Sequence, residues 1–124
     1  MIEISKGRIL FAIREGAKYF TEIEKFTKAS PNLVSKILEE LEKEGLIIPE
    51  LDRSSGRRRV YYKLNEGKED EINRLISLYL QYEKQEVKRG LKEMELVMHY
   101  IDFTEEEKKE IAELVEKLKK KLGV

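Results

Sequence analysis

Four arginines lie within seven residues and give the chain its strongest chemical signal. They are Arg53, Arg57, Arg58 and Arg59. Guanidinium groups bind phosphates through paired N–H donors, and arginines on a narrow protrusion suit the A·T-rich minor groove. Charges at a strand edge also protect a sheet from aggregation, although lysine or isolated charges usually serve that purpose. Because Asp52 is the one carboxylate nearby in sequence, phosphate binding is the favoured interpretation.

Residues 30–45 predict a helix with its own start and stop signals. Ser30 suits the capping position, Pro31 the first helical position and Gly45 the left-handed residue that ends a helix. Its apolar stripe consists of Val34, Ile37, Leu38 and Leu41. On its own this stretch fits an ordinary amphipathic surface helix better than a DNA-reading one. If the helix does enter a major groove, the residues at its start that would meet the DNA are Ser30, Asn32, Leu33, Ser35 and Lys36.

Catalytic chemistry is poorly supported. The chain has one histidine, no cysteine and no glycine-rich loop before a helix, which removes the commonest nucleophile–base pairs and phosphate cradles. The glutamates at positions 39, 40, 42 and 44 fit a solvated helix face. His99 beside Met98 suggests a pH or metal switch, but an exposed helix residue is the better interpretation. We therefore expect no enzyme, no metal and no cofactor.

Composition indicates one compact domain with an extension. The 124 residues are 40% charged and 40% hydrophobic, and the preference for Lys and Glu over Asn and Gln resembles proteins of heat-loving organisms. No apolar run approaches the ~18 residues of a membrane span, and no signal peptide is evident, so a cytoplasmic location is expected. Residues 1–65 hold 13 Lys/Arg against 10 Asp/Glu, and residues 66–124 hold 12 against 15. A polyanionic partner therefore belongs to the first half.

The first half predicts three helices and a β-hairpin. The first helix runs from Ser5 to Gly16, and the second begins at Thr21, which forms a capping box with Glu24. The second and third helices are joined too tightly to lie antiparallel, which predicts a helix-turn-helix unit. Residues 46–48 and 60–64 are the expected strands, joined by a turn at residues 52–56, and Pro49 indicates an edge strand or the end of the strand.

The second half predicts a long helix over residues 66–101 and a final helix capped by Thr104 and Glu107. The start of the long helix is expected to pack on the domain, and Gly90 is expected to bend or break it. Further along, apolar residues follow the spacing of a coiled-coil seam. The fold class is thus mainly α with a small β-hairpin (α+β), divided into residues 1–67 and a helical region at 68–124.

This order of parts resembles the winged helix-turn-helix of prokaryotic transcription regulators of the broad MarR/ArsR/HxlR type. The segments that carry the resemblance are residues 20–23, 30–47, 52–53 and 60–67, including Leu41-Glu42-Lys43-Glu44-Gly45-Leu46-Ile47. The resemblance implies a homodimer on double-stranded DNA, with the third helix as recognition helix and the arginines on the wing. The dimer interface would be formed by Val87, Leu91, Met94, Met98, Ile101, Leu114 and Leu118.

The sequence departs from this family pattern in two ways. Four glutamates make the far end of the recognition helix acidic, so only its first turns suit phosphates, and a metal-ligand set like that of ArsR-type sensors is absent. The favoured hypothesis is a sequence-specific DNA-binding transcription regulator, with a small-molecule effector left open. The alternative is a winged helix that contacts proteins within a larger assembly.

Overall fold

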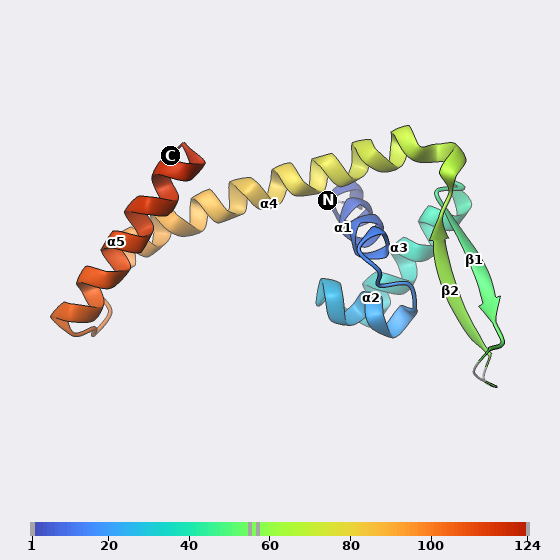
Figure 1. The fold of residues 1–124 in the computed structure, drawn as a ribbon, viewed down its shortest axis with the longest axis horizontal. Helices are drawn as coiled ribbons and strands as arrows, with labels where there is room; N and C mark the ends of the chain where they lie inside the picture. Colours follow the sequence, from blue (N-terminus) through green and yellow to red (C-terminus); the bar gives the residue numbers. More distant parts are fainter. Residues whose placement is uncertain (1, 55, 57, 124) are drawn as a thin grey trace. The chain divides into compact units, whose positions relative to one another are not determined.

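The structure is a computed structural model that describes residues 2–54, 56 and 58–123. It divides into two compact units, residues 1–80 and 81–124. The elements are α1 (Ile2–Arg14), α2 (Phe20–Thr27), α3 (Pro31–Lys43), β1 (Ile47–Asp52), β2 (Arg59–Leu64), the 3-10 turn η1 (Glu66–Lys68), α4 (Glu69–Val97) and α5 (Glu105–Leu122) (Figure 1). The expected class, mainly α with one antiparallel hairpin, is confirmed.

One apolar core holds the first unit together. It is built from α1, α2, α3, the base of the hairpin and the first turns of α4, and its largest side chains are Ile9, Leu10, Ile23, Val34, Ile37, Leu41, Leu46, Ile47, Leu75 and Ile76. The start of α4 packs into this core as expected, and the first compact unit extends to Leu80. Gly7 lies where α1 meets α4, directly against the Leu75 carbonyl.

Local signals place α3 as the sequence predicted. The Ser30 hydroxyl accepts a hydrogen bond from the Leu33 amide at 3.3 Å, and Pro31 is the first helical residue. Gly45 follows the helix with φ +72°, in the left-handed region that glycine enters without strain. The predicted apolar stripe, Val34 to Leu41, is buried.

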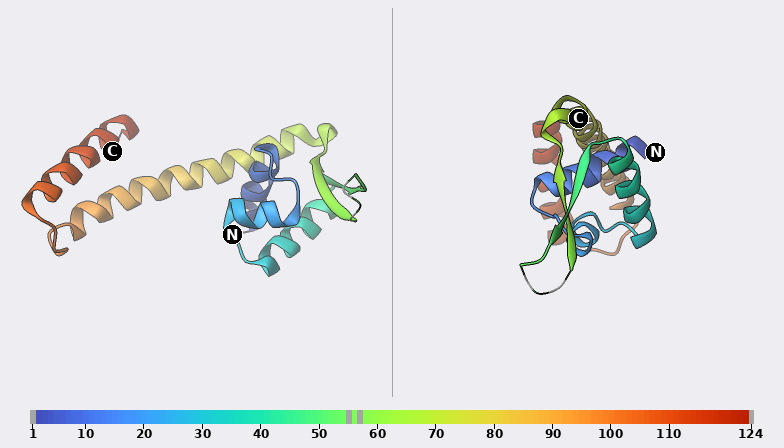
Figure 2. Two further views of the ribbon diagram at one scale, coloured as in Figure 1. Left: turned by 60° about the horizontal axis from the view of Figure 1, so that its bottom comes forward. Right: turned by 90° about the vertical axis from the view of Figure 1, so that its right-hand side faces the viewer.

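β1 and β2 form an antiparallel hairpin (Figure 2). In its register Ile47 lies opposite Leu64, and Asp52 lies opposite Arg59. Pro49 lies opposite Tyr62, whose amide donates to the Lys18 carbonyl at 2.9 Å and so points away from β1. The pair is therefore one without ladder hydrogen bonds, and the missing amide of Pro49 costs the sheet nothing. The expectation of an edge strand is confirmed.

Several predicted boundaries were wrong; β1 reaches Asp52 rather than residue 48, and α4 begins at Glu69 rather than residue 66. α1 begins at Ile2 rather than Ser5, because nothing before Ser5 breaks a helix. α2 begins one residue before Thr21, and its capping carboxylate is Glu22, which accepts from the Lys18 and Tyr19 amides at 3.2 and 3.1 Å. The long helix ends at Val97 rather than residue 101, and it continues through Gly90 without a break.

The second unit is a helical hairpin in which α5 folds back beside the end of α4 (Figures 1 and 2). Thr104 and Glu107 form the predicted capping box, with hydrogen bonds of 3.0 and 3.1 Å. Lys119 on α5 binds the Glu95 carboxylate on α4 at 2.9 Å. Among the described helices, none has the combined length and apolar character that crossing a bilayer requires.

Candidate nucleic-acid interface

The start of α3 presents the predicted contact residues to solvent. Asn32, Leu33, Ser35 and Lys36 are exposed, while the opposite side of the helix is buried in the core. Ser30 is also exposed, but its hydroxyl is engaged in capping the helix. The core therefore holds α3 rigidly by one face, and the other face is free for a partner.

Two lysines that sequence reasoning missed lie shortly before α3, one at the end of α2 and one in the connection that follows it. Lys25 is in the last turn of α2, and Lys28 follows that helix with φ +56°, an uncommon left-handed conformation for a residue with a side chain. Within the described part of the chain, neither these two nor Lys36 forms an ion pair. Their position just before Ser30 was a readable signal, because helix-turn-helix connections and helix N-termini commonly lie against phosphates.

The acidic far end of α3 is partly neutralised within the protein. Glu39 pairs with Lys43 at 3.5 Å, and Glu44 pairs with Lys6 on α1. Glu40 and Glu42 have no such partner among the residues the structure describes. The far end of α3 is therefore still acidic, but two of its four carboxylates are neutralised by lysines.

We call the β1–β2 hairpin with its connecting turn the wing. Its described arginines, Arg53, Arg58 and Arg59, lie in two different environments. Arg53 and Arg58 are exposed, and their side chains have no ion pair with any described residue. Arg57 lies outside the described residues. Arg59 differs from the first two, because its guanidinium carbon is 3.7 Å from the centre of the Tyr19 ring.

Asp52 organises the turn at the base of the wing tip. Its carboxylate accepts hydrogen bonds from the Ser54 hydroxyl at 2.6 Å and the Ser54 amide at 2.9 Å, and from the Tyr19 hydroxyl. The Ser54 hydroxyl, the Tyr19 hydroxyl and the Ser54 amide, with a smaller contribution from Arg59, lower the pKa of Asp52 to about 2. The hydrogen bond between the Tyr19 hydroxyl and Asp52 also raises the pKa of Tyr19. Asp52 is therefore ionised at every physiological pH.

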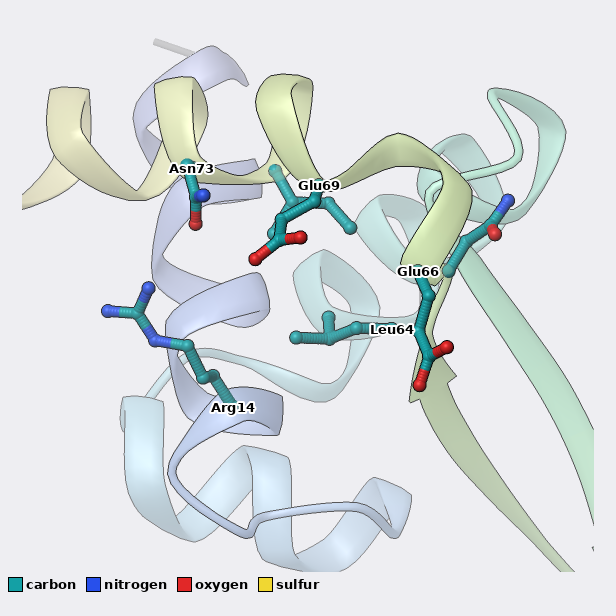
Figure 3. A pocket seen from close by; sticks show the side chains of 7 residues that line it. Arg14, Leu64, Glu66, Glu69 and Asn73 are labelled. Carbon is teal, nitrogen blue, oxygen red and sulfur yellow. The ribbon is translucent and has the colours of Figure 1, made fainter.

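A separate hollow of about 530 Å³ lies in the first unit, away from these residues. Figure 3 shows Arg14 and Asn73 at one side of it, Glu66 at the other, and the Glu69 carboxylate directed toward the space between them. Leu64 and Ile72 provide its apolar lining. Its volume is that of a small-molecule site, but its charged side chains are exposed at the surface.

The residues predicted for a dimer interface divide into two groups in the second unit. Leu91 is only 6% exposed, so it is already buried within the single chain, and Met98 is half-buried. The others are exposed: Val87, Met94, Ile101, Leu114 and Leu118. Sequence reasoning missed three further exposed apolar side chains near the end of α4, namely Leu96, Val97 and Tyr100.

Solved structures of transcription regulators share this architecture. Lactococcus lactis ZitR, as one variant free and bound to DNA, is 21% identical, with TM-scores of 0.55 and 0.54, and the matches cover 94% of this chain and 73% of ZitR. Staphylococcus aureus MepR, a regulator of the multidrug efflux pump MepA, is 20% identical with a TM-score of 0.52, covering 95% of this chain and 78% of MepR. A Clostridium difficile PadR-family regulator is 23% identical with a TM-score of 0.50, covering 76% of this chain and 97% of its own.

Comparisons of sequence alone add nothing to these likenesses, because no family model and no curated protein matches the chain. ZitR is described as a zinc-responsive MarR-family member, but the chain has no cysteine and one histidine, and its described residues contain no group of three or more potential ligands that could hold a metal. The shared feature is the architecture itself: the chain has the winged helix-turn-helix fold that its sequence predicted, which is also the fold of these MarR- and PadR-family transcription regulators.

Proposed function

We propose that the chain is a homodimeric, sequence-specific DNA-binding transcription regulator. In this proposal the start of α3 enters the major groove, and the wing lies on the phosphate backbone or in the minor groove. Asn32 is suited to adenine and Lys36 to guanine, and each such contact discriminates between bases by ~1–3 kcal/mol. No catalytic step, metal or cofactor is part of the proposal.

The observation that carries the proposal is a group of exposed cations around the start of α3 and on the wing. They are Lys25, Lys28 and Lys36 near the start of α3, and Arg53 and Arg58 on the wing. Cations without carboxylate partners in the described structure keep their full charge for an external polyanion. The DNA complex of ZitR, a protein of the same fold, supports this use of the fold.

Duplex binding tests the proposal directly. Fluorescence anisotropy against a library of genomic fragments at low salt should yield bound sequences, and the logarithm of affinity should fall linearly with the logarithm of salt concentration. Lys28→Ala and Arg58→Ala should each reduce the steepness of that line by about 0.9, the value for one phosphate contact, whereas Lys36→Ala should weaken the preference for guanine. Lys109→Ala, an exposed lysine on α5, is the matched control and should leave the line unchanged.

The homodimer is proposed from the exposed apolar residues of the second unit. Met94 and Leu118 are each 45% exposed, and Leu114 is 60% exposed, an arrangement that favours burial against a second copy. Two copies would place their α3 helices in successive major grooves about 34 Å apart. Sedimentation should give a dimer for the wild type and for Gln85→Lys, and a monomer for Met94→Lys/Leu118→Lys; a dimer that survives both lysines would refute this interface.

The acidic half of α3 favours a second candidate, a winged helix that contacts proteins. Glu40 and Glu42 are the α3 carboxylates without ion pairs in the described structure, and the net charge of the chain is zero. A polyanion is repelled by that end of the helix, whereas a basic protein surface is not. Absence of binding to every duplex at low salt would favour this second function.

A further inference from the structure

We infer that Tyr19 is a positioning residue that holds the wing to the α1–α2 connection, and that Arg59 serves this contact instead of binding DNA. The expected effect on DNA affinity rests on the proposed function above. The contact between Tyr19 and the wing is independent of that function, because it is made entirely within the first unit.

Main-chain pairing ties the connection to the hairpin. The Lys18 carbonyl accepts from the Tyr62 amide at 2.9 Å, and Tyr19 forms an isolated antiparallel bridge with Tyr61. β2 therefore has a partner on both of its edges: β1 on one and residues 18–19 on the other. This pairing restrains the middle of β2 but leaves the strand ends near the wing tip to be held by side chains.

The Tyr19 side chain reaches those strand ends. Its hydroxyl donates to Asp52, the last residue of β1, and its ring lies under the guanidinium of Arg59, the first residue of β2. Asp52 and Arg59 are opposite each other in the register. One tyrosine thus contacts the pair of residues from which the wing tip departs. We call this three-residue contact the latch.

The latch occupies the stacking face by which an arginine can bind DNA. The Arg59 guanidinium stacks on the Tyr19 ring at 3.7 Å, and Arg59 lies opposite Asp52 in the register without an ion pair between these two described residues. Arg53 and Arg58 have no such ring contact in the described structure. The described wing arginines therefore divide into a structural residue, Arg59, and two residues available to phosphates, Arg53 and Arg58.

A wing that is already held in place loses less conformational entropy when it binds DNA, because its orientation does not have to be fixed on binding. Tyr19→Phe removes the hydroxyl donor and keeps the ring. A hydrogen bond to a charged acceptor at a part-exposed site is worth about a tenfold change in a local equilibrium. We therefore expect wing amides to exchange hydrogen up to about tenfold faster and DNA affinity to fall about three- to tenfold.

The salt dependence distinguishes positioning from direct contact. Tyr19→Phe and Arg59→Ala should both lower the affinity for DNA. The slope of the logarithm of affinity against the logarithm of salt concentration (the salt line) should stay that of the wild type. Arg58→Ala should reduce the steepness by about 0.9. Tyr100→Phe, at a tyrosine that is 85% exposed in the second unit, is the matched control and should behave as wild type in both assays.

Hydrogen exchange in the free protein makes the latch testable without DNA. Faster exchange confined to residues 47–64, with α1 and α3 unchanged, supports the latch. Unchanged wing exchange in Tyr19→Phe, or an equal increase in every element, would overturn it. An Arg59→Ala salt line as shallow as that of Arg58→Ala would overturn the assignment of Arg59. Failure of the wild type to bind any duplex would refute the proposed function instead, and the exchange result would still decide the latch.

Discussion

Replacing Gly7 by alanine should destabilise the first unit, although alanine is the better helix former. Gly7 lies in α1 where that helix meets α4, and an added Cβ would be 2.1 Å from the Leu75 carbonyl oxygen and 2.8 Å from the Tyr79 Cβ. Carbon atoms in contact are normally about 3.5 Å or more apart. The two helices would have to separate by roughly 1 Å, against a core in which Leu75 and Ile76 are each 2% exposed.

The magnitude follows from two opposed terms. Alanine gains up to about 1 kcal/mol of helix propensity over glycine. Overpacking costs about 1–3 kcal/mol and occasionally more, and the upper part of this range applies because the obstructing atom belongs to the backbone and cannot change rotamer. The expected net loss is about 2 kcal/mol, which corresponds to a melting temperature roughly 8 °C lower for a chain of this size.

Gly90 supplies the matched control. It also lies inside a helix, α4, and no described atom comes within 4 Å of the position its Cβ would take. Gly90→Ala should therefore stabilise the chain by up to about 1 kcal/mol. Urea unfolding followed by circular dichroism compares the two variants with the wild type. A Gly7→Ala protein as stable as the Gly90→Ala protein would refute the close α1–α4 contact.

Three further predictions concern a cap, a carboxylate and the second unit. Ser30→Ala removes the acceptor for the Leu33 amide and should cost about 1 kcal/mol in urea unfolding; an equal loss in Ser35→Ala, at an exposed residue, would contradict this role. The pKa of Asp52 in the folded chain is about 2, below its ordinary 3.8, so its contribution to stability is complete above the ordinary value and is lost as pH falls through about 2. Carboxyl titration by NMR should show that midpoint, and one near the ordinary value would contradict the hydrogen bonds drawn to it. Leu91→Ala should lower the free energy of unfolding by about 2–4 kcal/mol at any protein concentration, because Leu91 is buried within one chain. Any loss of stability in Leu114→Ala should grow with protein concentration, because Leu114 is proposed to lie at the dimer interface. The reverse result would contradict the burial assigned to these two residues.

Elements with local signals were predictable from the sequence, and α3 is the clearest case. Ser30, Pro31 and Gly45 act on the backbone within a few residues of themselves, so their effects do not depend on distant parts of the chain. The start of α2 was mispredicted for the opposite reason. Residues 18–19 are paired with β2, more than 40 positions away, and this pairing moves the helix start ahead of Thr21 and makes Glu22 the capping carboxylate.

Prediction of the candidate site from the sequence was also limited by contacts between distant parts of the chain. Residue type and spacing were enough to single out the wing arginines and the polar start of α3. The different environment of Arg59 was not predictable, because its partner Tyr19 belongs to the α1–α2 connection and carries no motif. Lys25 and Lys28 were within reach of sequence reasoning, since they flank the short turn that was itself predicted.

Pro49 has a consequence for the solubility of the wing. Ile48, Leu51 and Val60 are each 44% exposed on the hairpin, and strands of this kind readily recruit a strand from another molecule. The outer edge of β1 has no amide at its centre, because Pro49 occupies a position whose nitrogen faces outward. An incoming strand would meet a carbonyl there without a neighbouring donor, and its pairing would stop. Pro49 thus prevents the hairpin from pairing edge to edge with a strand of another molecule, although its apolar side chains are exposed. Those side chains remain accessible to a partner.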